Sequence, residues 1–316
     1  MNTVLLPDET AVPVFAAGPD SGITETRRVA SWEAFTQAMG GFEPTRQLHV
    51  ALRSYFENGG GPCYVSPTAR WAEDIPSLED ATLLVAAGQD IQALVLALCT
   101  EGRPLFALLD GPRDALPDNG TWTHVSTSHA AVYYPWLGAD WAHVPIPPSA
   151  TVAGSFCTTD RHRGFWFTPT NLPLLGGVRP LHPVSDEQQA MFSGDKPLNM
   201  IRERDDRGAL VCGVRTLEGH AAWRYIAVRR SVGLIQRDLH RLLGATAREA
   251  SRQVLRSAIE SYLERLWKRG GLAGGTAQDA FFIQMDPDTH PALFVGLALA
   301  RGGEFIALRF TPGSPS

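Results

Sequence analysis

The chain has 316 residues, of which 44% are hydrophobic and 19% are charged, and its formal net charge is −5 at pH 7. This length fits two average domains, or one large domain with an appendage. The composition excludes collagen, a coiled coil and wholesale disorder. The negative net charge argues against nucleic-acid binding through bulk electrostatics.

The charge is unevenly distributed along the chain. Residues 201–270 contain 15 Lys+Arg against 8 Asp+Glu, whereas the remaining residues contain 13 against 25. Nearly all of the positive charge is arginine, since Lys196 and Lys268 are the only lysines. This asymmetry suits a subunit that meets differently charged neighbours, although two solvated faces are the simpler interpretation.

The cysteines and the N-terminus indicate a reducing compartment. Cys63, Cys99, Cys157 and Cys212 lack any Cys-x-x-Cys spacing, so we expect free thiols and no disulfide framework. The N-terminal residues lack a basic region followed by a long apolar region, and the sequence predicts no signal peptide. The longest apolar stretch, residues 91–99, is too short to span a bilayer. We therefore expect cytoplasmic assembly and no membrane insertion.

The chain up to Tyr134 alternates apolar strands with helices. Ser31 is a good N-cap for a helix over 32–39. The other helices in this part are expected at 45–58 and 91–100. Strands are expected at 11–17, 63–65, 81–86, 105–109 and 130–134. This alternation predicts an α/β fold in which helices flank a mixed sheet.

The second half of the chain predicts a smaller α/β segment. A short helix is expected over 148–157, and apolar stripes predict amphipathic helices at 228–242 and 255–266. Strands are expected at 210–214, 223–226, 280–284, 293–299 and 304–310. We divide the chain into a core domain, residues 1–200, and a C-terminal domain, residues 201–316, that ends in a strand.

Three sets of residues were weighed as catalytic or ligand sites. Glycines 59–61 follow a helix and precede Pro62, so a helix C-cap is favoured over a phosphate loop. Asp286, Asp288 and His290 alternate like metal ligands, but a Pro-Asp turn explains them better. His124, His129 and His143 show no helical pairing that suggests a metal. We therefore expect no metal site and no cofactor.

A remote alternative is a hydrolase-like enzyme with its site around Cys157, Asp160 and His162. This alternative needs the three side chains to converge in a pocket. The chain contains no Gly-x-Ser-x-Gly motif that would support it. We expect no catalytic residues.

Arginines form a basic face on the helix expected over 228–242. Arg230, Arg237 and Arg241 lie at i, i+7 and i+11, and only Asp238 offsets their charge locally. The alternatives are a solvated helix face and a docking surface for an acidic partner. Nucleic acid is disfavoured, because no aromatic residues are interleaved with these arginines.

The most specific segment of the chain is 52–65, in which a helix ends in Asn-Gly-Gly-Gly-Pro before Cys-Tyr-Val. Further short motifs lie at 10–15, 31–35, 40–42, 133–136, 147–154, 160–164, 169–171, 199–202, 213–217, 223–226, 228–230, 266–270, 280–282 and 304–306. In this order they resemble the tail sheath proteins of contractile phage tails and related injection systems. The resemblance covers nearly the whole chain.

The resemblance implies a structural protein. Sheath subunits of this family form stacked hexameric rings around an inner tube, and contraction drives the tube through a target envelope. The expected partners are further copies of the chain, the inner tube protein, other sheath paralogues and a baseplate. The C-terminal region of the family tends to face the tube, which makes Arg230, Arg237 and Arg241 the tube-docking candidates.

The resemblance also implies that strands link successive rings. Terminal arms add strands to a neighbour's sheet, and the matching residues here are Glu304, Phe305, Ile306, Ala307, Leu308, Arg309 and Phe310. The family's N-terminal arm is longer than the Met1 to Glu9 segment here. We therefore expect a compact sheath subunit, with an end-ring, baseplate-proximal or cap component as the alternative. The sequence leaves open whether the particle is a phage tail or an injection system.

Overall fold

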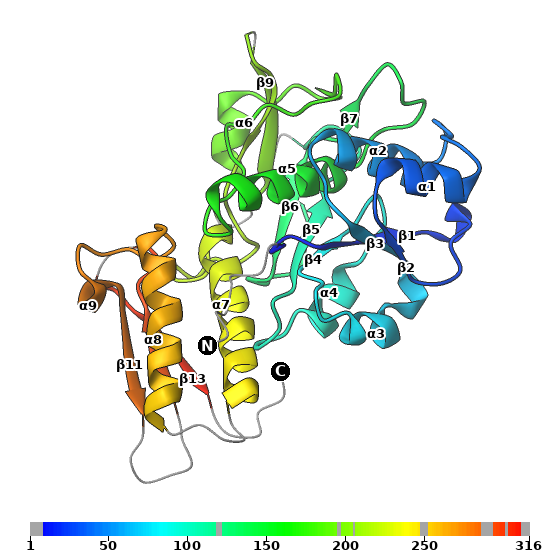
Figure 1. The fold of residues 1–316 in the computed structure, drawn as a ribbon. Helices are drawn as coiled ribbons and strands as arrows, with labels where there is room; N and C mark the ends of the chain where they lie inside the picture. The colour runs from blue at the N-terminus through cyan, green and yellow to red at the C-terminus, as the bar shows by residue number, and fades with distance from the viewer. Residues whose placement is uncertain are drawn as a thin grey trace. The chain divides into compact units, whose positions relative to one another are not determined.

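The computed structural model describes residues 9–117, 122–194, 197–204, 206–246, 252–285, 293–300 and 303–310. It contains two compact units (Figure 1). The core unit comprises Asp8–Thr100 and Leu105–Arg230, and the C-terminal unit comprises Ser231–Ser316 together with Glu101–Pro104.

A sheet of eight strands, in the order β10-β9-β6-β5-β4-β1-β3-β2, forms the centre of the core unit. The strands are β1 (Pro13–Ala17), β2 (Arg27–Val29), β3 (Cys63–Pro67), β4 (Leu83–Val85), β5 (Phe106–Asp110), β6 (Ala130–Tyr134), β9 (Asn199–Arg204) and β10 (Gly208–Cys212). Neighbouring strands from β9 to β3 are parallel, and the edge strands β10 and β2 are antiparallel to their neighbours. The predicted α/β fold with a mixed sheet is confirmed.

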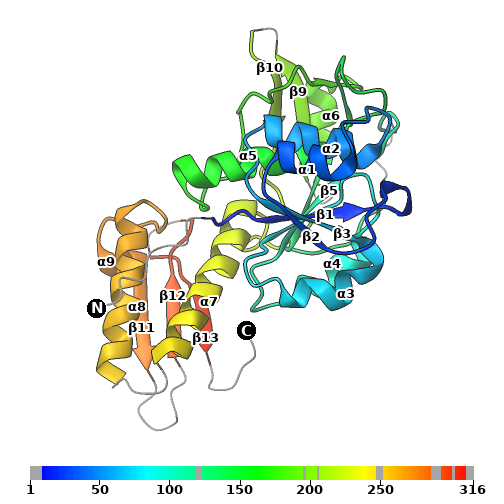
Figure 2. The same cartoon turned by 45° about the vertical axis from the view of Figure 1, so that its right-hand side comes forward.

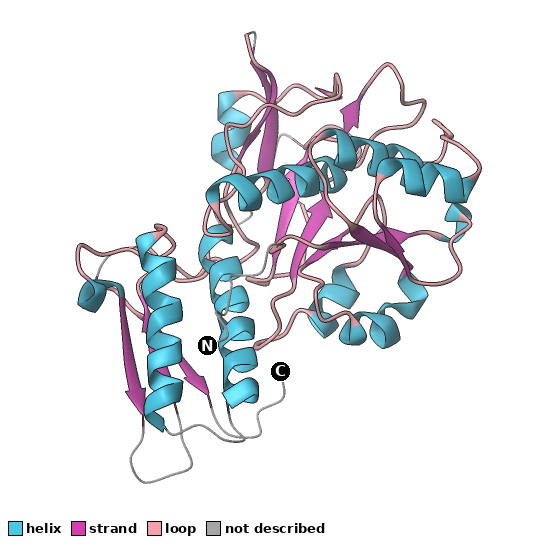
Figure 3. Cartoon of the chain, viewed as in Figure 1, coloured by secondary structure: helices cyan, strands magenta, loops and turns pink. Residues whose placement is uncertain are grey.

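Helices cover both faces of this sheet (Figures 1 and 3). One face carries α1 (Trp32–Met39), α2 (Gln47–Glu57) and α5 (Pro148–Arg163), and the other carries α3 (Trp71–Asp74) and α4 (Gln92–Leu98). The first layer buries Phe35, Leu52 and Phe156 against the sheet, and the second buries Trp71 and Val95. Because both faces are covered, the inner strands are apolar throughout, as their sequences predict. The core unit also contains α6 (Asp186–Met191), a short β7–β8 pair (Leu137–Gly138 and Arg179–Pro180) and three 3-10 turns (Pro19–Ser21, Thr68–Arg70 and Ile75–Ser77).

The Asn-Gly-Gly-Gly segment ends α2 and holds it against α5. Gly59 has φ +85°, its N–H donates to the Phe56 carbonyl at 3.0 Å, and the Gly60 N–H donates to the Tyr55 carbonyl at 3.0 Å. These are the two hydrogen bonds of a Schellman motif, so the predicted helix C-cap is confirmed. The Thr158 hydroxyl of α5 donates to the Asn58 carbonyl at 3.1 Å. The segment therefore fixes the packing of two helices as well as the end of one.

Gly154 allows α2 and α5 to pass closely. A Cβ at position 154 would collide with the Tyr55 carbonyl oxygen and would lie 2.9 Å from the Asn58 Cβ. We expect Gly154→Ala to lower the free energy of unfolding in urea by about 1–3 kcal/mol, because the two helices must separate. Gly244→Ala is the matched control, since nothing lies within 4 Å of its added Cβ. The control should raise stability by up to about 1 kcal/mol, and equal effects at both glycines would contradict the close packing.

The C-terminal unit packs two long helices on one face of a three-stranded antiparallel sheet (Figure 2). The helices are α7 (Ile226–Thr246), whose first turn belongs to the core unit, and α8 (Arg252–Lys268). The short helix α9 (Ala277–Ala280) precedes the strands β11 (Phe281–Met285), β12 (Leu293–Leu297) and β13 (Ile306–Phe310), which pair in chain order. The predicted apolar stripes of both helices are buried, as Ile235 and Leu239 in α7 and Ile259 and Leu266 in α8 illustrate. This confirms the two amphipathic helices.

Two details differ from the sequence predictions. The strand predicted at 223–226 is wrong, because α7 begins at Ile226 and only Tyr225 forms a bridge, to Arg215. Helix α5 continues to Arg163, well beyond Cys157. The contacts divide the chain at Arg230, with β9 and β10 in the core sheet, and the domain boundary at residue 200 stays a prediction.

None of the described helices is long and apolar enough to cross a membrane.

Candidate functional site

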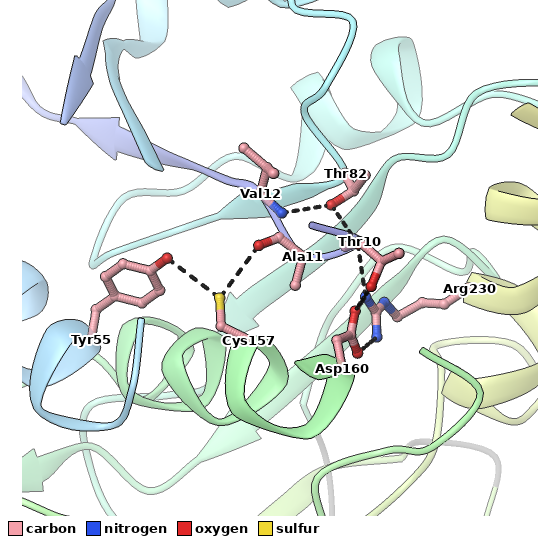
Figure 4. Close-up of polar contacts among 8 residues, drawn as sticks. All are labelled: Thr10, Ala11, Val12, Tyr55, Thr82, Cys157, Asp160 and Arg230. Carbon is pink, nitrogen blue, oxygen red and sulfur yellow. Dashed lines mark hydrogen bonds and ion pairs between the residues drawn. The ribbon is translucent and has the colours of Figure 1, made fainter. Parts of the chain in front are cut away.

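A buried polar network surrounds the start of β1, where the chain enters the core unit (Figure 4). The Thr10 hydroxyl donates to Asp160 Oδ2 at 2.7 Å, and the Thr82 hydroxyl donates to the Thr10 carbonyl at 3.0 Å. The Val12 N–H in turn donates to the Thr82 hydroxyl oxygen at 2.9 Å. These hydrogen bonds supply partners for the Thr10 carbonyl and the Val12 N–H, which lie just before strand β1.

An ion pair between α5 and the first turn of α7 completes this network. The Arg230 guanidinium contacts both Asp160 carboxylate oxygens, with Nη1–Oδ1 at 3.0 Å and Nη2–Oδ2 at 2.7 Å. The two side chains are 2% and 3% exposed, and the guanidinium also lies 4.8 Å from the Phe156 ring centre. A bidentate pair in this setting is geometrically specific, and both charges depend on one another for compensation.

Cys157 lies beside the network, and its surroundings are those of a structural thiol. Its Sγ is 3.4 Å from the Ala11 carbonyl oxygen and 3.4 Å from the Tyr55 hydroxyl. Burial raises the pKa of the Cys157 thiol, and burial also raises the pKa of the Tyr55 hydroxyl. A nucleophilic cysteine needs the opposite shift, toward the thiolate.

The three residues of the hydrolase alternative do not converge. Asp160 is engaged by Arg230 and Thr10, Cys157 contacts Ala11 and Tyr55, and His162 is exposed on the last turn of α5. In the described part of the chain, the thiol therefore has neither Asp160 nor His162 beside it as the base that nucleophilic catalysis requires.

The residues weighed as metal ligands are not brought together either. The His124 ring lies tilted against Trp122, with the ring centres 4.6 Å apart, His129 is buried near the Leu105 carbonyl, and His143 is exposed. Within the described part of the chain, no three His, Cys, Asp or Glu side chains are grouped as metal ligands. Asp286, Asp288 and His290 lie outside the described residues.

A cavity of about 180 Å³ lies at the carboxyl ends of β4, β5 and β6, where α/β folds often bind ligands. Asp110 lines it with a half-buried carboxyl group, and desolvation raises the pKa of this carboxyl to about 6. Its two oxygens already accept the Ser149 and Gly88 N–H groups, each at 2.8 Å. Asp110 thus ties β5 to the start of α5 and to the β4 loop, which is a structural role.

The structure separates the three arginines that the sequence grouped as a docking face. Arg230 is internal, as described, and Arg237 is 7% exposed and pairs with Asp238 at 3.1 Å. Tyr262 of α8 donates its hydroxyl to the same carboxylate at 3.0 Å. Only Arg241 of the three presents an exposed side chain. The basic stripe on α7 is therefore mainly an internal feature, because helical spacing places residues on a face without telling whether that face is covered.

The C-terminal strand, predicted at 304–310, is β13 and begins at Ile306. It pairs with β12 of the same chain over its whole length, from Leu297↔Ile306 to Leu293↔Phe310. Leu308 and Phe310 are buried, and the Phe310 ring meets His240 of α7 at 5.0 Å. Within the described residues the other side of β13 has no strand partner, so β13 is an edge strand.

Known proteins share this architecture. No family model matches the chain. The PVC sheath complex of an extracellular contractile injection system, in its contracted state, contains a chain that is 42% identical with a TM-score of 0.88. The match covers 96% of this chain and 92% of that one. The chain belongs to the contractile sheath protein family.

Two further similar proteins support the assignment. A chain of the anti-feeding prophage baseplate, in the contracted state, is 35% identical with a TM-score of 0.83, over 96% of this chain and 93% of that one. A putative prophage major tail sheath protein of Pseudomonas aeruginosa (strain UCBPP-PA14) is 26% identical over 259 residues, or 74% of this chain. The chain spans 62% of the length of that relative. The predicted resemblance and the structural sheath role are confirmed.

The network at Thr10, Asp160 and Arg230 was not predicted as a unit, although motifs of the sheath resemblance include all three residues. The sequence signal that could have found it is Asp160 itself, the one acid of α5, which ends an uncharged and largely buried run over 148–159. A buried helix that carries one carboxylate needs a cation, and the nearest arginine-rich helix follows in the chain.

Proposed function

We propose that this sheath subunit assembles with copies of itself into hexameric rings that stack around an inner tube and contract to drive the tube through a target envelope. The similarity over 96% of the chain to a subunit of a PVC sheath complex carries the proposal. Assembly places the chain in a phage tail or injection-system particle after it folds in the cytoplasm.

The proposed link between rings is strand β13. As a paired edge strand it can exchange its place with the same strand of a neighbour, because identical chains offer identical grooves. Residues outside the strand then absorb the rotation of subunits during contraction.

We infer that the subunit works without catalysis. Its thiol and carboxylate candidates are engaged in structural contacts, and His162 is exposed and does not line the cavity beside Asp110. For contact with the tube, Arg241 remains the candidate, because its charge is exposed.

A second candidate is a specialised subunit at the baseplate-proximal or opposite end of the sheath. The observation in its favour is the match at 35% identity to a chain from a baseplate assembly. Such a subunit would form single rings and would depend on another sheath protein for the length of the particle.

Negative-stain microscopy of the purified chain, with and without its presumed tube partner, tests both candidates. The main proposal expects hollow sheaths of stacked rings that require or favour the tube. Long sheath-like tubes formed by this chain without other proteins would reject the end-ring candidate. A chain that stays monomeric with the tube would reject both.

A further inference from the structure

Among the described residues of the C-terminal unit, helices cover one face of the three-stranded sheet, and no helix or strand of this unit covers the other face (Figure 2). Helices α7 and α8 lie on the same side of β11–β13 in both views. The strand residues that alternate toward the helices, such as Val295 and Leu308, are buried. Residues of the opposite face alternate toward solvent, where polar side chains are the rule in a two-layer unit.

This second face carries aromatic residues beside the polar Gln284 and Arg309. Phe282 of β11 and Phe305, just before β13, are 38% and 37% exposed, and Phe294 of β12 is half-buried. Arg309 of β13 places its guanidinium 5.6 Å from the centre of the Phe294 ring. We call Phe282, Phe294, Phe305 and Arg309 the aromatic face.

The aromatic rings are held in place by the sheet. The Phe282 ring lies over the backbone of Gly296, where any Cβ would collide with it. Phe305 meets the Phe282 ring edge-on, with centroids 5.1 Å apart and planes at 79°. Rings fixed in this way lose little conformational entropy on binding, and aromatic residues with arginine are the usual anchors of protein interfaces.

The charge of the two units indicates what binds there. The core unit contains 17 Lys+Arg and 24 Asp+Glu, whereas the C-terminal unit contains 11 and 9. The C-terminal unit is thus slightly basic, and the core unit is strongly acidic. Contact between unlike units of successive copies is favoured electrostatically, whereas contact between two core units is opposed.

We propose that the aromatic face docks on the core unit of a second copy of this chain. The contact is head-to-tail, and repeated head-to-tail contacts generate rings or helical assemblies. The inference rests on the proposed self-assembly and adds a side-chain surface to it, distinct from the backbone edge of β13. Its partner is a sheath copy and not the tube.

Site-specific photo-cross-linking tests the choice of partner. Phe305 is replaced by the photoreactive analogue p-benzoylphenylalanine, and equal amounts of isotope-labelled and unlabelled chains are assembled before irradiation. We expect cross-links between differently labelled chains, from position 305 to peptides within residues 8–230. Cross-links mainly to the tube, or only to the C-terminal unit of another copy, would overturn the proposal.

A substitution gives the second, independent readout. Phe305→Ser should leave the circular dichroism spectrum of the monomer unchanged and lower its melting temperature only slightly, since Phe305 lies outside the strand and loses only its ring contact with Phe282. It should raise the concentration needed for assembly roughly tenfold, as expected when an interface anchor is lost. Val254→Ser is the matched control, because Val254 is an exposed apolar residue, at 55%, on α8 of the same unit.

The outcomes separate this inference from the proposed function. If the unaltered chain does not assemble, the proposed self-assembly fails and the inference fails with it. If the unaltered chain assembles and Phe305→Ser does so at the same concentration as Val254→Ser, only the docking role of the aromatic face is wrong.

Discussion

Replacing Arg230 by methionine is expected to lower the free energy of unfolding by about 3–5 kcal/mol, because the Asp160 carboxylate is left buried without its cation. The two side chains are 2% and 3% exposed, so water cannot replace the lost guanidinium. The Thr10 hydroxyl remains as a donor to Asp160, but one neutral hydrogen bond does not compensate a buried charge. Urea denaturation followed by circular dichroism measures the loss.

An exposed ion pair of the same core unit supplies the control. Arg179 pairs with Asp140 at 2.9 Å, and these side chains are 55% and 92% exposed. Arg179→Met should therefore leave the stability almost unchanged. The double variant Arg230→Met with Asp160→Leu should recover most of the lost stability, since an apolar pair removes both buried charges. Similar losses for Arg230→Met and Arg179→Met would show that the Asp160 pair is not buried in solution.

The burial of the Arg230–Asp160 pair decides which arginine of α7 can be used to test contact with the tube. Reversing the charge of Arg230 would destabilise the core unit, so a loss of assembly in that variant would report on folding. Arg241 carries the exposed charge and is the position at which reversal can report on contact with the tube.

The sequence predicts the inner strands and the long helices because their signals are local. The apolar run of β5 and the Ser31 cap of α1 are examples, and the Ser31 hydroxyl oxygen does accept the Ala34 N–H. Strand β9 was missed because its second half, Arg202 to Arg204, pairs only with β10 and extends past β6. Such a two-stranded ribbon tolerates charged residues, and no apolar pattern marks it.

The candidate site was less predictable, because its pairs are distant in sequence. Arg230 and Asp160 are 70 residues apart, so periodicity could group Arg230 with Arg237 but could not reveal its partner. The strand predicted at 223–226 is wrong for a different reason. Its aromatic and β-branched residues favour a strand, but tertiary context makes Ile226 the first residue of a helix.

The second large effect concerns strand β13 and is best tested by holding the strand in place. Truncating the C-terminus would be a poor test, because Leu308 and Phe310 are buried and each contributes about 1.5–3 kcal/mol to the C-terminal unit. Exchange between copies costs little overall, since each strand leaves one groove and enters an identical one. A covalent link across the β12–β13 pair blocks exchange and keeps the fold.

Leu297 and Ile306 are directly paired across β12 and β13, so Leu297→Cys with Ile306→Cys places two thiols opposite each other. We expect the oxidised double variant to remain folded and to form no sheaths by negative-stain microscopy, and we expect a reducing agent to restore assembly. The single variant Ile306→Cys controls for the native thiols, of which Cys212 is the half-buried one. Normal sheaths from the fully oxidised double variant would mean that β13 stays in its own sheet and that successive rings are joined by another contact.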